Sequence, residues 1–499
     1  MKIYERTNAT MKKQVISAVM ALAVIAGTAG TLAAPVVPAL NSLTVSAADT
    51  QLDLANLPDG KYKMEINMVK IDTESASMSS AAVSPEVVLS VENGKYYIIV
   101  EFQGITIGTT LGYLKSLSYY DTGYTYDRFG NPKGTITKAE VLTSYNGYVD
   151  MYNDTDSPYP HTLKFPVVDG YKTDEEYNAG KNVQFVPLHV YVPAMAGFED
   201  QDVLMKLNWN TLEKKESELI GSQLSVSGDI TMNNYIELSD EVLSDSGAKV
   251  VSTVNGFTSE TAVSDAKNTE NGYQFAVNVP AKDMTEDVTV EVKLSDGTVV
   301  DTYTVSVEEY AMNIIYGDYS DSQKSAAKAL LNYGTYAQKY FAEKNKTTPK
   351  RLANENLSAT DKWDDDALNA VSFNSFGYTT EGTDRNAGVR YAGSCLSLVS
   401  ETAINHYFLI PDIEGITFKV NGKETSPIKD GDNYYVPVTG ISAPNLATKY
   451  EVTVSNGTNT YTLNYSAMDY CKAAQDSDKI TTGLENVTKA LYLFYNATK

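Results

Sequence analysis

The chain has 499 residues, a hydrophobic fraction of 42% and a formal net charge of −23 at neutral pH. This length predicts about two to four domains, since domains usually hold roughly 100–200 residues. Such an acidic surface repels phosphate backbones and excludes nucleic acid as a partner, while the hydrophobic and tyrosine content excludes global disorder.

Residues 1–48 have the pattern of a secretory signal peptide. Lys12 and Lys13 form a basic segment, Val15–Ala29 is the apolar segment that follows, and Val45–Ala48 supplies small residues for cleavage. No later stretch reaches the roughly 20 apolar residues that a membrane span requires, so we expect no membrane span in the mature chain. The pattern predicts an extracellular protein, either secreted or associated with the cell surface.

Strand signals dominate residues 49–212, the first predicted domain. Lys63–Val69 alternates apolar and polar side chains, which is typical of a half-buried strand. Asn93-Gly94 lies between two apolar runs, and this dipeptide is a strong signal of a β-hairpin. Phe185–Pro193 and Val203–Trp209 follow as a closing strand pair. Several short strands with turn residues between them predict a β-sandwich.

Four short motifs occur in order within this domain. They are the opening Leu57–Tyr62, a Ser77-Met78 element, the hairpin Val91–Tyr97 and the closing Val190–Met195. Their order and spacing resemble the NEAT (near iron transporter) domain family, an immunoglobulin-like β-sandwich that captures haem outside Gram-positive bacteria. The resemblance implies a secreted or surface protein of the Firmicutes that takes part in haem binding and iron transport.

The resemblance also implies a set of cofactor-binding residues. In the family, haem lies between a short helical lip near the start of the domain and a hairpin near its end. The lip matches residues 76–80, so Ser77 or Ser79 is expected to bond a haem propionate, and Met195 and Phe198 match the hairpin. An apolar slot with a few polar groups at its mouth suits a planar porphyrin or another small apolar ligand.

Iron ligation departs from the family pattern. The family has two tyrosines separated by three residues after the Val-Pro pair, whereas this chain has Phe198 and Asp202. Some family members use methionine, so Met78 on the lip and Met195 beside the hairpin are the expected metal ligands, because a thioether suits haem iron. Methionines at such positions also commonly fill gaps in a core. Met205 and His189 are weaker candidates.

Residues 213–345 and 370–499 repeat each other, and residues 346–369 between them are expected to be a solvated linker. Four segments recur in the same order, which indicates an internal duplication. The first and last matched pairs are Leu224–Tyr235 with Leu396–Tyr407 and Ala327–Tyr333 with Thr488–Phe494. The duplicated half resembles a module common in secreted proteins of gut Clostridia.

Each copy is predicted to be an α+β module, a small β unit followed by a helical hairpin. The fold class is therefore mainly β with α: an immunoglobulin-like, NEAT-like sandwich followed by two duplicated modules. The polar run Glu213–Glu218 predicts a short helix or linker between the sandwich and the first module. The expected helices are Val307–Tyr316, Ser320–Phe341, Ser466–Gln475 and Gly483–Thr498, with Ser320-Asp321-Ser322 as caps for the second.

Several alternatives stay open. Cys395 and Cys471, the two cysteines of the chain, are either joined in a disulfide or present as unpaired thiols. With three histidines and no phosphate-binding loop, metalloprotease His pair or nucleophile elbow, the sequence predicts no enzymatic activity. The alternative to haem capture is an adhesion or glycan-binding surface protein whose sandwich binds no metal. Its tyrosine-rich region Tyr113–Tyr177 would contact a host protein or a cell-wall glycan.

Overall fold

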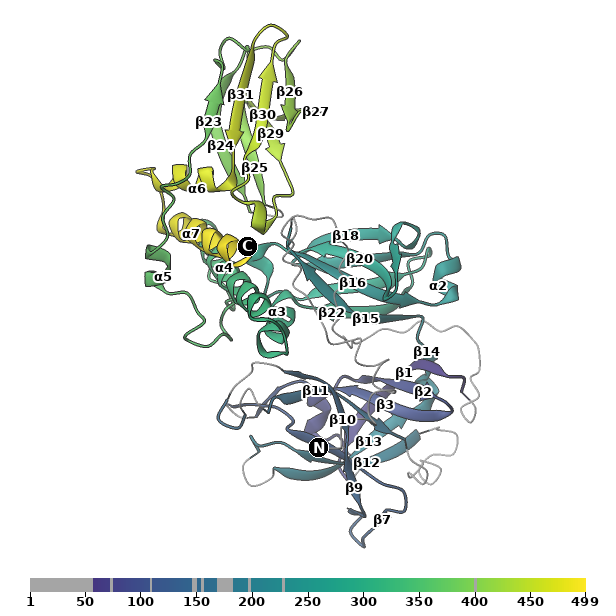
Figure 1. Ribbon diagram of the computed structural model, residues 1–499. Helices are drawn as coiled ribbons and strands as arrows, with labels where there is room; N and C mark the ends of the chain where they lie inside the picture. The colour runs from purple at the N-terminus through teal and green to yellow at the C-terminus, as the bar shows by residue number, and fades with distance from the viewer. Residues whose placement is uncertain are drawn as a thin grey trace, which may run out of the picture.

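The computed structural model describes residues 57–71, 75–107, 110–145, 150–153, 157–167, 183–195, 199–226, 229–398 and 402–499. The expected signal peptide over residues 1–48 and Phe198 lie outside the described residues. An N-terminal β-sandwich is followed by two further β-rich modules, and the long helices of both modules lie together (Figure 1). The predicted fold class, mainly β with α, is confirmed.

Two antiparallel sheets form the N-terminal sandwich. Their strand orders are β10-β11-β3-β2-β1 and β1-β13-β12-β6-β9, so β1 belongs to both sheets. The strands are β1 (Gly60–Val69), β2 (Glu86–Glu92), β3 (Lys95–Glu101), β6 (Ser116–Tyr120), β9 (Ile136–Lys138), β10 (Glu140–Tyr145), β11 (Tyr159–Pro166), β12 (Val183–Tyr191) and β13 (Asp200–Asn208). Smaller elements are β4 (Ile105–Ile107), β5 (Thr110–Gly112), β7 (Thr125–Tyr126), β8 (Pro132–Lys133), β14 (Glu213–Lys214), η2 (Met78–Ala82) and η4 (Trp209–Thr211).

Strand β1 crosses from one sheet to the other. Gly60–Glu65 pairs with β2 and Ile66–Val69 pairs with β13. Met64, Ile66 and Met68 are each at most 2% exposed and fill the core between the sheets, which confirms the predicted alternation. Burying each of these side chains contributes about 1.5–3 kcal/mol, so the strand that links the sheets is also a main part of their core.

The opening motif Leu57–Tyr62 contacts the hairpin Val91–Tyr97. Both carboxylate oxygens of Asp59 accept backbone hydrogen bonds from the β2–β3 turn, at 2.8 Å from Asn93 and 3.1 Å from Gly94. These two turn residues have positive φ angles of 53° and 69°, which glycine and asparagine tolerate best. The opening motif therefore holds the tight hairpin that the sequence predicted.

Each module places two sheets beside a helical hairpin. The first module has the strand orders β15-β16-β20-β19 and β18-β17-β21-β22, and the second has β24-β25-β29-β28 and β23-β31-β30-β26-β27. A register shift at Gly221 in β15 recurs at Gly393 in β24, so the leading sheets match in detail. The first module's strands are β15 (Ser217–Ser225), β16 (Thr231–Leu238), β17 (Lys249–Val254), β18 (Phe257–Ala262), β19 (Lys267–Thr269), β20 (Gly272–Asn278), β21 (Val288–Lys293) and β22 (Val299–Val305). The second module's strands are β23 (Thr379–Glu381), β24 (Arg390–Ser397), β25 (Ala403–Leu409), β26 (Thr417–Val420), β27 (Lys423–Thr425), β28 (Ile428–Asp430), β29 (Asn433–Val438), β30 (Tyr450–Ser455) and β31 (Thr460–Tyr465).

The helical hairpins of the two modules pack against each other. Tyr333 and Phe494 stack with ring centroids 5.4 Å apart and planes inclined by 6°, and one hydrophobic core runs through both modules. Ser320 forms a capping box, which confirms its predicted role. The long helices are α3 (Val307–Tyr316), α4 (Asp321–Asn345), α6 (Ala467–Gln475) and α7 (Thr482–Ala497), close to the predicted bounds. Shorter helices are α2 (Asp240–Ser244), α5 (Asp365–Asn369), η5 (Val263–Asp265), η6 (Ala281–Asp283) and η7 (Ala443–Asn445).

Residues 346–369, which we name the strap, connect the two modules and are exposed along most of their length, but they are anchored at a few points. Ala353, Leu357 and Leu368 are 0%, 4% and 1% exposed and belong to the shared core of the modules. These buried side chains hold the strap against the modules. Composition alone does not reveal such anchors.

A buried amide network fixes the strap on α4. Asn332, which is fully buried, accepts hydrogen bonds from Asn354 Nδ2 at 2.8 Å and from the backbone N–H of Trp363 at 2.9 Å. Its own Nδ2 donates to the carbonyl of Asp361 at 2.9 Å. Because a buried amide without partners is costly, this network holds the strap in one place.

The polar run Glu213–Glu218 is extended and not helical. Strand β14 pairs with β1, and β15 begins at Ser217. Asp301 of β22, which is 4% exposed, accepts from the backbone N–H and the hydroxyl of Ser217 at 2.8 Å each and pairs with Lys215 at 3.0 Å. Strand partners on both sides override the helical tendency of the run.

The two cysteines are both free thiols. Cys395 is exposed on β24 and Cys471 is buried in α6, so the structure contains the unpaired alternative. Burial raises the pKa of Cys471. Among the helices of the described residues, none is long and apolar enough to cross a membrane.

An ionic contact joins the sandwich to the first module. His161 of β11 lies 2.9 Å from Glu101 of β3 and 3.9 Å from Glu309 of α3, and its ring centroid is 4.6 Å from that of Tyr145. Burial by itself lowers the pKa of His161. The hydrogen bond to Glu101 and the charges of Glu101 and Glu309 outweigh burial and raise this pKa above its ordinary value of 6.5.

We expect the contact between His161 and α3 to weaken as the pH rises. Because the folded-state pKa is raised, the stabilisation is complete below about 6.5 and is lost as the pH rises through the folded-state value. Amide hydrogen exchange in α3, corrected for intrinsic rates, should be faster at about pH 8 than at about pH 6. His161→Gln should remove this difference and His189→Gln should not. A difference that survives in His161→Gln contradicts the assignment.

Candidate ligand-binding site

The expected lip is a short 3-10 helix, η2, that follows the end of β1. Val69 forms a bridge with Ala76, so the chain folds back over the end of the strand. The carbonyl of Met68 accepts two hydrogen bonds from the lip, at 2.9 Å from the backbone N–H of Ser77 and at 2.6 Å from the hydroxyl of Ser80. Two donors on one carbonyl fix the lip against the sheet.

The two lip serines use their hydroxyl groups differently. Ser77 is the N-cap of η2, and its Oγ accepts hydrogen bonds from the backbone N–H of Ser79 at 3.3 Å and from the Ser79 hydroxyl at 2.9 Å. Ser79 therefore uses its hydroxyl hydrogen within the lip. Ser77 accepts both bonds and can donate its own hydrogen outward, so Ser77 is better suited than Ser79 to bind a carboxylate.

The outer face of the second sheet begins beside the lip. Val203 and Met205 of β13 point into the core, so the alternate residues Asp202 and Leu204 face outward. The strand register then defines two rows across this face. An apolar row runs from Val69 of β1 through Leu204 of β13 to Pro187 of β12. A polar row runs from Asp202 of β13 through His189 of β12 to Ser118 of β6.

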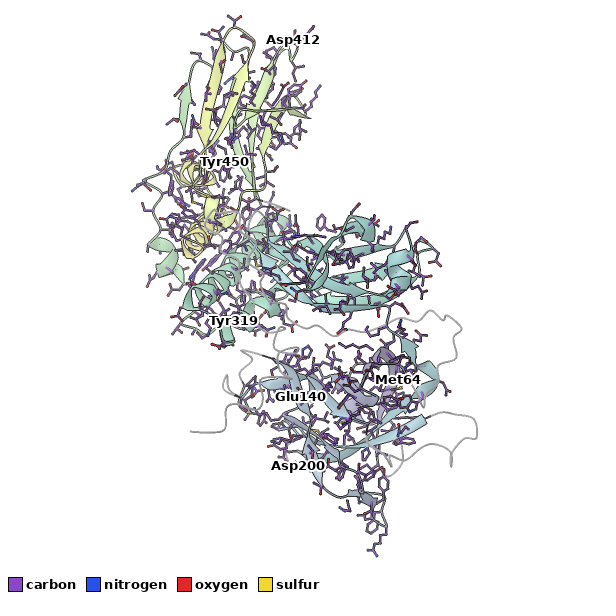
Figure 2. All side chains as sticks on the ribbon, turned by 45° about the vertical axis from the view of Figure 1, so that its right-hand side comes forward. Met64, Glu140, Asp200, Tyr319, Asp412 and Tyr450 are labelled. Carbon is purple, nitrogen blue, oxygen red and sulfur yellow. The ribbon has the colours of Figure 1, made fainter. Side chains whose placement is uncertain are left out.

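Asp202 holds a hydrogen-bonded trio together on this face. Its Oδ1 accepts from the hydroxyl of Tyr120 at 2.8 Å and lies 2.9 Å from His189 Nδ1. Because a carboxylate only accepts, the Nδ1 atom carries a hydrogen. His189 Nε2 lies 3.3 Å from Asp200 Oδ1, and the Asp200 side chain is 68% exposed. Asp200 lies farther from the two modules than Glu140 does (Figure 2).

The trio determines what each group can do chemically. Burial, together with the hydrogen bond to Asp202, raises the pKa of Tyr120 well above its ordinary value. The hydroxyl hydrogen of Tyr120 is thus engaged by Asp202 within the trio. An imidazole that donates Nδ1–H to a carboxylate is the usual arrangement of a metal-binding histidine, and Nε2 of His189 becomes available to a metal once the exposed Asp200 carboxylate, 3.3 Å away, is displaced. His189 is thus the residue of this face best suited to bind iron.

The apolar row is covered by the protein's own residues. Val69, Phe185 and Leu204 are 5%, 2% and 3% exposed and form a small hydrophobic cluster with Ile71. The segment between β6 and β9, residues 121–135, which we name the excursion, carries Gly130. Gly130 lies close to Ile71, since a Cβ atom placed on it would be 3.8 Å from the Ile71 carbonyl oxygen. A planar ligand reaches this row only if Ile71 and the excursion move.

The predicted site residues occupy the two ends of this region. Met78 is 58% exposed on the lip. Met195 is half-buried in the turn after β12, where its backbone N–H donates to the carbonyl of Val192 at 3.0 Å. The ligand roles of Met78 and Met195 stay predictions. Met205, a weaker candidate, is fully buried in the core and cannot bind a ligand.

The trio was missed from the sequence because it depends on strand register. Tyr120, His189 and Asp202 come from three strands, and His189 opposes Asp202 only once the β12–β13 turn is known. A partial signal was present, since His189 falls in the first predicted closing strand and Asp202 directly precedes the second, which the structure begins earlier, at Asp200. Aligning those strands about their turn would have placed them together.

Three cavities lie in other parts of the described residues. A small one of about 30 Å³ lies between the modules beside Tyr333 and Phe494. One of about 470 Å³ lies at the junction of the sandwich and the first module, and one of about 480 Å³ lies on the strap. None of these three is lined by Met78, Met195 or His189.

No protein-family model matches the chain. Among solved structures, the NEAT5 domain of IsdX2, a B. anthracis hemophore in complex with heme, is 18% identical with a TM-score of 0.19, and the match covers 30% of this chain and 96% of that one. A mutant of the same domain with heme is 19% identical with a TM-score of 0.20 and the same coverage. A protein from Corynebacterium diphtheriae described as membrane anchored is 9% identical with a TM-score of 0.16, over 82% of this chain and 89% of that one. At such low similarity, function has to be argued from the residues of the site.

Asp202 should be far more important for stability than its neighbour Asp200. Asp202→Ala leaves the hydroxyl of Tyr120, which is 5% exposed, without this acceptor, and we expect a loss of about 1–3 kcal/mol in the free energy of unfolding. Asp200→Ala removes an exposed partner of the same imidazole and should cost less than about 0.5 kcal/mol. Urea unfolding followed by Trp209 fluorescence, in a Trp363→Phe background, measures both. Equal losses would refute the central role of Asp202.

Proposed function

We propose that the N-terminal sandwich captures haem outside the cell and that His189 is an axial ligand of the iron. The observation that carries the proposal is the pair formed by His189 and Asp202 on the outer face beside the lip, where Nδ1 and Oδ1 are 2.9 Å apart. The motif resemblance to NEAT domains supports the same location. Asp202 stands where the family has its second tyrosine, and in this proposal its carboxylate orients the imidazole of His189.

The residues of the face fit the chemical parts of haem. Bound haem supplies an iron that accepts axial ligands, an apolar ring and two propionates. His189 would bind the iron through Nε2, with Asp202 fixing the ring. The apolar row around Leu204 would contact the porphyrin, and Ser77 would donate to a propionate. Met78, exposed on the lip, would be the candidate second ligand of the iron.

Capture on this face requires an opening step. Val69 and Leu204 of the apolar row and the neighbouring Phe185 are at most 5% exposed, so the excursion that carries Gly130 has to leave Ile71 first. Exposing that row to water is unfavourable, by about 25 cal/mol per Å² of apolar area, and contact with the porphyrin offsets this loss. We therefore expect the sandwich to capture haem more slowly than the diffusion limit would allow.

The experiment is a titration of the purified chain with hemin, followed in the visible spectrum. Capture gives a sharp Soret band distinct from that of free hemin. His189→Ala should weaken the affinity by more than about tenfold, because removing even a supporting residue of a metal ligand costs that much. Of the two variants Met78→Ala and Met195→Ala, the one that removes a thioether bound to the iron should shift the Soret band.

Matched controls exist within the chain. His161→Gln removes the other sandwich histidine, and Met151→Ala removes a methionine that is 83% exposed and lies outside the site; neither should change the spectrum. A spectrum equal to that of free hemin in the unmodified protein would contradict haem capture. A band that is unchanged in His189→Ala would contradict the assignment of the ligand.

An adhesion or glycan-binding surface protein is the alternative, and exposed apolar side chains on the sandwich favour it. Besides Met78, Leu111 and Tyr126, five apolar side chains of β7–β11 and their connections are at least 36% exposed, and exposed apolar area can mark an interaction surface. They are Phe129 (65%), Ile136 (42%), Val141 (50%), Leu142 (36%) and Met151 (83%). This alternative is preferred if hemin binding fails and the same chain binds immobilised host protein or cell-wall glycan.

We further propose that the protein is exported, acts by binding and performs no catalysis. The signal-peptide pattern supports export. The two modules share one core and one helical bundle, so they would act as a single stiff unit for spacing or attachment, in the manner of the secreted clostridial modules they resemble.

A further inference from the structure

An open cavity of about 480 Å³ lies between α4 and the strap (residues 346–369). Its lining residues belong to α4 and to the strap, which includes α5 at its end (both helices are labelled in Figure 1). Its lining combines one of the chain's two tryptophans with a group of charged side chains. They are Lys339, Lys350, Arg351, Glu355, Lys362 and Trp363.

The charge of this cavity opposes that of the whole chain. Four of the lining side chains are cationic and one, Glu355, is a carboxylate, whereas the chain carries a formal charge of −23. Asp364, Asp365 and Asp366 follow Trp363 directly but do not line the cavity, and Asp364 caps α5. A small anion in the cavity would meet four cationic side chains, while Glu308, which pairs with Arg351, and Asp364, which is next to Trp363, lie close enough to reduce their positive field.

The cations are held at different points around the opening. The guanidinium of Arg351 pairs with Glu308 at 2.7 Å and donates to the carbonyl of Thr285 at 3.1 Å. Lys362 Nζ donates to the carbonyl of Glu355 at 2.8 Å. Lys339 Nζ lies 4.9 Å from the centroid of the Tyr336 ring. Lys350 is exposed, and within the described part of the chain it makes no ion pair.

Trp363 has a fixed position in the cavity. Its backbone N–H donates to Asn332 Oδ1 at 2.9 Å, and its carbonyl accepts from the hydroxyl of Tyr336 at 3.1 Å. Its side chain is half-buried and packs against the core that both modules share. Its backbone is therefore held in place and its half-buried side chain lines the cavity, where a ligand ring could pack against the indole at little cost in conformational entropy.

We propose that this cavity binds a carboxylate-bearing sugar, such as a uronic acid unit of a glycan. The apolar face of a pyranose ring would stack on Trp363, and its carboxylate would bind Lys350 and Arg351, which suit carboxylate recognition. The volume lies within the range of about 300–1,000 Å³ that small-ligand sites usually have. A long polyphosphate would meet the acidic surface beyond the cavity, which disfavours nucleic acid.

The test is isothermal titration of the full chain with digalacturonate, with cellobiose as the uncharged probe and inorganic phosphate as the anion without a ring. Digalacturonate should bind, its affinity should fall as salt is added, and cellobiose should show no measurable binding. In a Trp209→Phe background, digalacturonate should also change the fluorescence of Trp363, which places the sugar at this cavity.

Variants separate binding from folding. Lys350→Glu reverses an exposed charge and should lower the affinity by more than about tenfold, the usual scale for loss of a charge-assisted hydrogen bond. Trp363→Phe keeps an aromatic face and should weaken binding less than Trp363→Ala. Lys344→Ala, a cation at the end of α4 that does not line the cavity, should have no effect. Phosphate binding as tight as digalacturonate binding, or binding that survives Lys350→Glu, would overturn the proposal, as would no binding of digalacturonate.

Discussion

The crossing of β1 between the two sheets is the constraint on which the sandwich and its candidate site depend. Its first half pairs with β2 and its second half with β13, so Val69 arrives beside Leu204 on the outer face of the second sheet. The lip η2 must then start at that point, where the Met68 carbonyl binds it twice. Breaking the crossing would separate the lip from the polar row of His189 and Asp202.

The position of Asp202 decides what the outer face of the second sheet can do chemically. Its Oδ1 accepts from Tyr120 and lies 2.9 Å from Nδ1 of His189, so this carboxylate is used within the protein. In the proposed function the metal-binding atom is therefore Nε2 of His189 on β12. The same arrangement stabilises the closing hairpin, because Tyr120 ties β6 to β13 across β12.

Local patterns predicted the elements well and their contacts poorly. The alternation in β1, the Asn93-Gly94 turn and the Ser320 cap follow from rules that act within a few residues. The strap and the trio around Asp202 depend on partners far away in sequence. Asn332 meets Trp363 across 31 positions and Tyr120 meets Asp202 across 82. The helical tendency of Glu213–Glu218 lost to strand pairing for the same reason, since β1 supplies hydrogen bonds that the run cannot supply alone.

The most direct measurement of the central claim is a nitrogen-15 NMR titration of histidine-labelled protein with gallium protoporphyrin, a diamagnetic analogue of haem. With three histidines in the chain, each imidazole can be assigned by substitution. The account predicts that Nδ1 of His189 keeps its hydrogen while Nε2 shifts on binding, and that His161 and His406 stay unchanged. Binding that leaves both nitrogens of His189 unperturbed would contradict the account.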